Sequence, residues 1–236
     1  MDSEALNQLP VCSVNGRIIV IDSPVGVEAA IAELRHEGLI GFDTETRPSF
    51  TKGVRYSISL LQLATRTTAY LFRLQMIGLN EPLKALLEDP SVIKVGLSTH
   101  DDFHSLQRWM PCAPKGFIEL QQYVKAFGIE DMSLQKIYAI VFGERISKTQ
   151  QLSNWELNPL TPAQCKYAAI DAWACLFIYY KMENKSLDDT FTPNPQHIIS
   201  AQPSKKAKPN AGSSSKKAKS SRIYKKRKPQ APKPTA

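Results

Sequence analysis

Short apolar runs alternate with amphipathic stretches over most of the chain. Continuous apolar runs bounded by turn residues predict strands at residues 17–22, 39–45, 56–64, 68–72, 92–97 and 117–120. Apolar residues three and four positions apart predict helices at residues 25–36, 82–87, 101–109, 121–127, 133–141 and 162–182. The short polar link between residues 64 and 68 predicts that the two flanking strands form an antiparallel hairpin.

The order of these elements predicts the fold class. A strand and a helix come first, three strands follow, and alternating helices and strands complete the series. Three consecutive strands ahead of alternating elements favour a sheet with both parallel and antiparallel neighbours. We therefore expect an α/β fold in which a mixed central sheet is flanked by helices on both faces.

The predicted strand at residues 39–45 ends in two carboxylates, Asp43 and Glu45. Side chains alternate along a strand, so both acids lie on one face, with Cα atoms about 6–7 Å apart. Two like charges this close within a sheet are unfavourable unless a cation lies between them. The simpler interpretation is a strand end with two solvated acids, and this stretch alone leaves both open.

A second acidic position follows the predicted strand at residues 92–97, where Asp101 and Asp102 begin a helix. Aspartate is a favoured N-cap and complements the helix dipole, so capping is the better interpretation of this segment by itself. Leu106 lies four residues after Asp102 and shares its helix face, which selects Asp102 rather than Asp101 as the acid turned toward the core.

The last predicted helix carries an acid on its inward face. Thr161, Pro162 and Gln164 form a strong helix start, with a cap residue, a proline at the first position and a glutamine at the third. Tyr167 and Asp171 are four residues apart, among apolar neighbours, and so share the inward face. A buried carboxylate without a partner is strongly destabilising, so Asp171 indicates either a functional site or a core aspartate bonded to Tyr167.

Together, these acids predict a metal site if they converge on one cleft. Four carboxylates would carry a charge of −4, which two divalent cations would neutralise. All-oxygen ligands select Mg²⁺ or Mn²⁺ rather than zinc, and two such cations clamp the attacking and leaving oxygens of a phosphoryl displacement. The tyrosine hydroxyl would orient the attacking water. The residues concerned are Asp43, Glu45, Asp102, Asp171 and Tyr167.

Three ordered motifs resemble one known family. They are Phe42-Asp43-Thr44-Glu45, Val95-Gly96 with Asp102 six residues after the glycine, and Tyr167-Ala168-Ala169-Ile170-Asp171. This combination resembles the ribonuclease D and Werner-type 3′–5′ exonucleases, which are DEDD nucleases of the tyrosine subtype on a ribonuclease H-like fold. The resemblance covers about residues 17–182, includes supporting segments at residues 61–63 and 152–161, and is strongest to small stand-alone bacterial members.

The resemblance implies a role for each residue of the set. Asp43 would bridge two cations, Mg²⁺ or Mn²⁺. Glu45 and Asp171 would hold the cation that activates water, and Tyr167 would orient that water. Asp102 would hold the second cation, directly or through water.

The resemblance also implies the reaction and its substrate. The expected activity is hydrolysis from the 3′ end of single-stranded or 3′-recessed nucleic acid, with release of 5′-mononucleotides. Thr44 would lie beside the terminal nucleotide, and Arg47 would contact a phosphate. Both DNA and RNA fit this expectation, and any oligomeric state is compatible with it.

Charge divides the chain into an acidic body and a basic tail. All 22 acidic residues precede residue 191, whereas 12 of the 30 basic residues follow it, so the two parts carry −4 and +12. Residues 191–236 are rich in Pro, Ser, Lys and Ala, a composition that predicts disorder. We expect a lead-in at residues 1–16, an exonuclease domain at residues 17–185 and a disordered basic tail at residues 186–236 that contacts phosphates.

Two alternatives concern what this tail does. A catalytically silent nucleic-acid-binding protein could use the same fold and rely on the tail, although four acids facing a phosphate backbone would then only weaken binding. The basic run at residues 224–229 also fits a nuclear localisation signal. We expect a cytoplasmic protein if the source is bacterial, and a nuclear one if it is eukaryotic.

The remaining features predict a soluble intracellular protein without a membrane partner. No cysteine pair has a C-x-x-C spacing, which favours reduced, buried thiols. The acidic N-terminus leads into no apolar signal core, and the longest apolar run is too short to cross a bilayer. The cysteines are Cys12, Cys112, Cys165 and Cys175.

Overall fold

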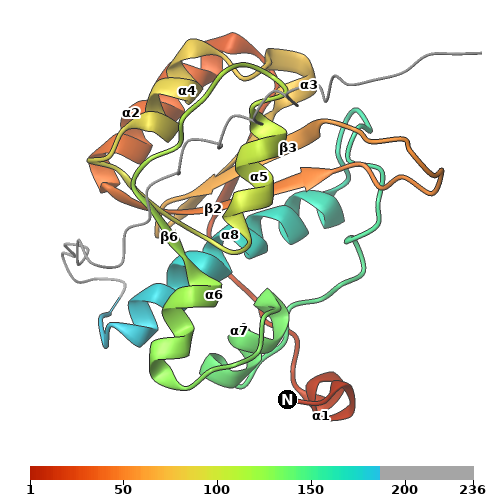
Figure 1. The fold of residues 1–236 in the computed structure, drawn as a ribbon, viewed down its shortest axis with the longest axis vertical. Helices are drawn as coiled ribbons and strands as arrows, with labels where there is room; N and C mark the ends of the chain where they lie inside the picture. The colour runs from red at the N-terminus through yellow and green to blue at the C-terminus, as the bar shows by residue number, and fades with distance from the viewer. Residues whose placement is uncertain (187–236) are drawn as a thin grey trace, which may run out of the picture. The chain divides into compact units, whose positions relative to one another are not determined.

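Six apolar segments pair into one sheet in a computed structural model, which describes residues 1–186 (Figure 1). The strands are β1 (Arg17–Ile21), β2 (Leu39–Thr46), β3 (Ile58–Ala64), β4 (Thr68–Arg73), β5 (Ile93–Gly96) and β6 (Phe117–Glu119), in the order β1-β4-β3-β2-β5-β6. Strand β3 is antiparallel to β2 and β4, and the other pairs are parallel. The predicted mixed sheet is therefore confirmed, as is the hairpin between β3 and β4.

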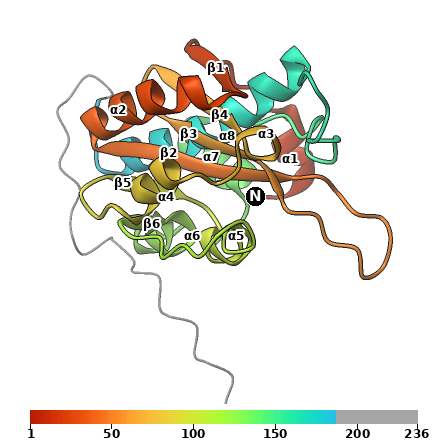
Figure 2. The ribbon, with the colours of Figure 1, turned by 90° about the horizontal axis from the view of Figure 1, so that it is seen from above.

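Helices cover both faces of this sheet (Figures 1 and 2). One face packs against α2 (Val27–Glu37), α4 (Glu81–Glu88) and α5 (Thr99–Leu106), whose leucines and Phe103 join the apolar residues of the strands. The other face packs against α6 (Leu120–Tyr123), α7 (Leu134–Phe142) and α8 (Pro162–Met182). Short helical turns are η1 (Pro24–Gly26), α3 (Leu74–Ile77) and η2 (Val124–Phe127). None of the helices within residues 1–186 has the length and apolar character of a membrane span.

The long helix α8 lies directly on the sheet, and its start is the predicted one. Thr161 and Gln164 form a complete capping box, with Pro162 in the first turn. A Cβ atom at Gly41 of β2 would lie only 2.0 Å from the carbonyl oxygen of Ala172. Only glycine therefore permits this close crossing, and the crossing brings the middle of α8 against the polar end of β2.

The segment before β1 has more structure than the sequence predicts. It contains a short helix, α1 (Ser3–Gln8), whose first turn is capped by the side chain of Asp2. Beyond α1, the amide of Cys12 donates to the carbonyl of Arg145 (2.9 Å), and the amide of Arg145 donates to Pro10 (2.8 Å). Local periodicity cannot predict this pairing, because its partner comes from the loop after α7. The predicted tail lies outside the described residues from residue 187 onward.

Candidate active site

The alternation of side chains gives the C-terminal end of β2 two chemically different sides. Phe42 belongs to the core formed with α2, α4 and α5, and Thr44 faces the same way toward α5. Asp43 and Glu45 face the opposite side, where α8 crosses. The prediction that the two acids lie on one face is therefore confirmed, because β2 pairs regularly with β3 from Gly41 to Glu45.

Helix α8 adds a third carboxylate to this side. Asp171 is only 6% exposed, and oxygens of Asp43, Glu45 and Asp171 all lie within 4.8 Å of one another. Burial raises the pKa of Asp43 well above its ordinary value, and the charge of Asp171 raises it further. Burial also raises the pKa of Glu45 to about 10 and that of Asp171 to about 7. Asp171 is buried and the other two acids are half-buried, so three carboxylates this close cannot all ionise cheaply. Their all-oxygen donor set fits a hard divalent cation.

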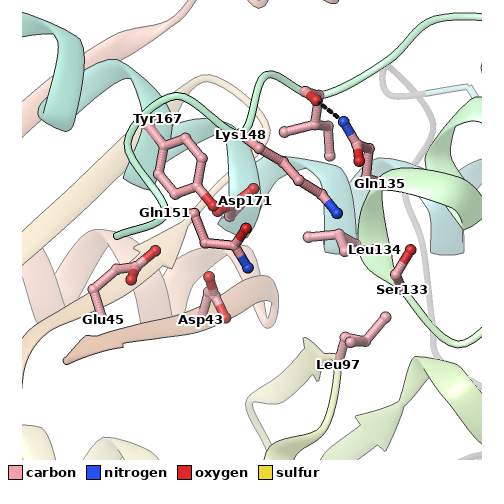
Figure 3. A pocket seen from close by; sticks show the side chains of 11 residues that line it. Asp43, Glu45, Leu97, Ser133, Leu134, Gln135, Lys148, Gln151, Tyr167 and Asp171 are labelled. Carbon is pink, nitrogen blue, oxygen red and sulfur yellow. Dashed lines mark hydrogen bonds between the residues drawn. The ribbon is translucent and has the colours of Figure 1, made fainter. Parts of the chain in front are cut away.

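Tyr167 lies one helical turn before Asp171, and its side chain lies beside that acid in the cavity (Figure 3). Its hydroxyl donates a hydrogen bond to Asp171, which lowers the pKa of that acid against the effect of burial. The Tyr167 ring packs against buried Trp155, with centroids 5.8 Å apart. The side-chain amide of Gln164 donates to the carbonyl of Asn154 (3.1 Å), so the segment that carries Trp155 is attached to the start of α8.

Helix α5 begins at Thr99, two residues earlier than predicted, because its N-terminus has a cap from another strand. Ser98 adopts a left-handed backbone conformation, with φ 58°. The carboxylate of Glu119, at the end of β6, accepts hydrogen bonds from the amides of Ser98 (2.9 Å) and Thr99 (2.8 Å). The sequence-based interpretation of Asp101 or Asp102 as the cap is therefore wrong. Glu119 was missed, since only the sheet order places it there.

Because Glu119 caps α5, the side chain of Asp102 is not needed as a cap and instead contacts β2. Its Oδ1 accepts a hydrogen bond of 2.5 Å from the hydroxyl of Thr44, whereas Asp101 is exposed. Burial raises the pKa of Asp102 well above its ordinary value, and the charge of Asp43 raises it further. Asp102 is not a member of the close cluster of three acids. It lies beside the end of β2, and its charge contributes to the raised pKa of Glu45 in that cluster.

An open cavity of about 300 Å³ exposes the acidic cluster to solvent (Figure 3). Residues that the sequence did not single out complete its walls. Lys148 and Gln151 reach in from the loop between α7 and α8, and Ser133 lies opposite at the start of α7. No periodic pattern marks a loop residue, so Lys148 could be found only from the fold.

Arg47 does not line this cavity. Its guanidinium donates to Glu156 (2.9 Å) and lies 4.8 Å from the ring centroid of Tyr56, and the side chain lines a separate cavity. Of the seven residues predicted to contribute to the site, the cavity therefore contains Asp43, Glu45, Tyr167 and Asp171, while Thr44 and Asp102 pair beside it and Arg47 lies outside it.

Comparisons with known proteins found similar sequences and similar folds for most of the described chain. The family model described as 3′-5′ exonuclease matches residues 18–186. The mouse bifunctional 3′-5′ exonuclease/ATP-dependent helicase WRN is 34% identical over 64% of this chain, and a ribonuclease D of Gluconacetobacter diazotrophicus is 26% identical over 68% of it. These matches span 11% and 41% of the two relatives, respectively. Among solved structures, RNase D from Escherichia coli superposes with a TM-score of 0.63 and 26% identity, over 72% of this chain and 45% of that one.

Proposed function

The chain belongs to the 3′–5′ exonuclease family, and on this basis we propose that it hydrolyses nucleic acid from the 3′ end and releases 5′-mononucleotides. The observation that carries the proposal is the cluster of Asp43, Glu45 and Asp171 in one open cavity with Tyr167. We also propose that residues 17–185 carry this activity, and that the basic residues from 186 onward contact the phosphate backbone.

The acids have the chemistry needed to hold divalent cations, Mg²⁺ or Mn²⁺ in this proposal. Asp43, Glu45 and Asp171 would hold one, and Asp43 together with Asp102 would hold a second. When bound, the cations supply Lewis-acid stabilisation of the charge that develops on the phosphate. Glu119 and Thr44 would contribute by position, because Glu119 fixes the start of α5 and Thr44 holds the Asp102 carboxylate beside the end of β2.

The other groups act on water and on the strand. Tyr167, anchored to Asp171 and packed on Trp155, would orient the attacking water through its hydroxyl. Water adds to the phosphorus, the P–O3′ bond breaks, and the released 3′ oxygen takes up a proton. Lys148 points into the cavity and would contact the phosphate under attack.

Labelled strands provide the test. Full-length protein is incubated with matched DNA and RNA oligomers, single-stranded or with a recessed 3′ end, in Mg²⁺, Mn²⁺ or EDTA. We expect stepwise shortening from the 3′ end with either cation, and none in EDTA or with Asp171→Asn. A folded protein that binds the oligomers but hydrolyses none of them in either cation would instead be a catalytically silent binder.

A further inference from the structure

A second cavity, of about 380 Å³, lies between α5 and the loop that joins β2 to β3. Its walls include three arginines, Arg47, Arg55 and Arg108, together with His104 and Tyr56. None of the residues that line it is acidic. In a domain whose first 190 residues carry a net charge of −4, this cavity is a local concentration of positive charge.

Two of the three arginines are held in place by hydrogen bonds. Arg108 donates to the carbonyls of Tyr56 (3.1 Å) and Arg55 (3.4 Å), which fastens the loop to the end of α5. Arg47 is paired with Glu156 and stacks on Tyr56. Arg55, by contrast, forms no ion pair with any acid among residues 1–186 and is exposed. The cavity therefore has a preformed wall, and the guanidinium of Arg55 is available to a ligand.

The same loop presents an aromatic side chain to solvent. The loop extends beyond the ends of β2 and β3 (Figure 2), and Phe50 within it is 85% exposed. Lys52 and Arg55 lie two and five residues further on. An exposed ring among cations suits single-stranded nucleic acid, because bases stack on aromatic rings while cations follow the phosphates.

The second cavity adjoins the acidic cluster through two elements. Thr46 in its wall follows Glu45 directly in the chain. At the rise of an extended chain, the Cα atom of Arg47 lies about 6.5 Å from that of Glu45. His104 and Ser105 follow Asp102 on α5. A strand whose 3′ end lies among the acids can therefore continue around the end of β2 into this cavity.

We propose that this cavity and the loop form a second subsite for the substrate strand, on the 5′ side of the nucleotide being removed. Arg55, Arg108 and Arg47 contact phosphates, and Phe50 stacks on a base. Because these contacts are to phosphates and to base faces, they bind single strands of any sequence. This inference rests on the proposed exonuclease function, since it assigns the direction of the strand.

Fluorescence anisotropy of the full-length protein with a labelled 12-nucleotide single strand, in EDTA and at several salt concentrations, tests the subsite. Arg55→Ala and Phe50→Ala change exposed side chains, so both variants should fold. Lys125→Ala, an exposed lysine on η2 that lines neither cavity, is the matched control. Arg55→Ala should weaken binding severalfold and reduce the salt slope by about 0.7. Phe50→Ala should weaken binding about fivefold or more without changing the slope.

Either variant binding as the unmodified protein does would overturn the role of that side chain, and both doing so would overturn the subsite. An equal loss with Lys125→Ala would show diffuse charge attraction instead, and would also overturn it. Because binding is measured in EDTA, it does not depend on hydrolysis. Failure of the exonuclease assay would therefore refute the proposed activity while leaving these affinities as a separate result.

Discussion

The hydroxyl of Thr44 on β2 donates a hydrogen bond of 2.5 Å to the carboxylate of Asp102 on α5. The two residues are 58 positions apart in the chain, and the contact links the first acidic motif to the second. It also separates two adjacent acids by environment, because Asp101 is exposed while burial raises the pKa of Asp102.

This contact predicts which of the adjacent acids matters for hydrolysis. Asp102→Ala should lower kcat/KM by at least about 100-fold, and Thr44→Val, which removes the hydrogen bond, by about tenfold. Asp101→Ala should stay within about threefold of the unmodified enzyme, because the side chain faces solvent. Steady-state kinetics on one labelled oligomer give all three values. An inactive Asp101→Ala beside an active Asp102→Ala would reverse the assignment.

The substitution Tyr167→Phe distinguishes a role of Tyr167 in the reaction from a role in folding. The substitution keeps the ring that packs on Trp155 and removes only the hydroxyl that donates to Asp171. Turnover should fall by about 100-fold or more, in the range of contributions from groups that position or transfer protons. Cation binding, followed by calorimetry, should change little. Unchanged turnover would make Tyr167 a packing residue.

The acidic cluster predicts how stability depends on pH in the absence of cations. The folded protein holds the protons of Asp43, Glu45, Asp102 and Asp171 more tightly than the unfolded chain, because each pKa is raised. The stabilisation from these protons is complete below about pH 4 and is lost as the pH rises through about 7, where Asp171 ionises, and toward 10, where Glu45 does.

Thermal melts in EDTA should therefore give a Tm at least about 3 °C lower at pH 8 than at pH 5.5. Mn²⁺ should raise the Tm more at pH 8, where fewer protons compete for the carboxylates. Asp171→Asn should flatten the pH dependence in EDTA. A Tm that rises between pH 5.5 and pH 8 in EDTA would contradict the raised pKa values.

Replacing the buried Gln62, which lies next to the acidic cluster, should stabilise the protein. It is fully buried and lies opposite Asp43 in the pairing of β2 with β3, and neither amide atom has a hydrogen-bond partner among residues 1–186. A buried unsatisfied polar group costs about 1–3 kcal/mol. Gln62→Leu should therefore raise the free energy of unfolding by about 1 kcal/mol or more, measured with urea in EDTA.

Gln135→Leu is the matched control for that measurement. Gln135 is also buried, but its amide donates to the carbonyl of Ile146 at 2.5 Å, so the substitution should destabilise the protein. If both leucine variants lower the free energy of unfolding, then Gln62 has a hydrogen-bonded role in the folded protein that the contacts within residues 1–186 do not provide.

Truncation after residue 190 tests the basic tail, because residues 191–236 carry +12 and lie outside the described residues. Removal should raise the KM for long strands and reduce the dependence of binding on salt, because fewer counterions are released. Turnover at saturating substrate should change little, since none of the residues assigned to chemistry is removed. Identical salt slopes for the two proteins would exclude the tail from substrate binding.

The sequence by itself determined the features that depend on near neighbours in the chain. The pairing of Asp43 with Glu45 on one face follows from strand alternation, and that of Tyr167 with Asp171 from helical spacing. The start of α8 at Pro162 follows from its capping box. Each of these is set within a few residues, where backbone geometry leaves little choice.

Only the tertiary structure decided how these pieces meet. Glu119 caps α5 because β6 lies beside β5, and α8 reaches the acids because Gly41 leaves room for its backbone. Arg47 pairs with Glu156, 109 residues away, instead of facing the acidic cavity. Such contacts depend on the packing of a whole sheet and its helices, since many distant partners satisfy the same local pattern and only one arrangement buries the core while satisfying its polar groups.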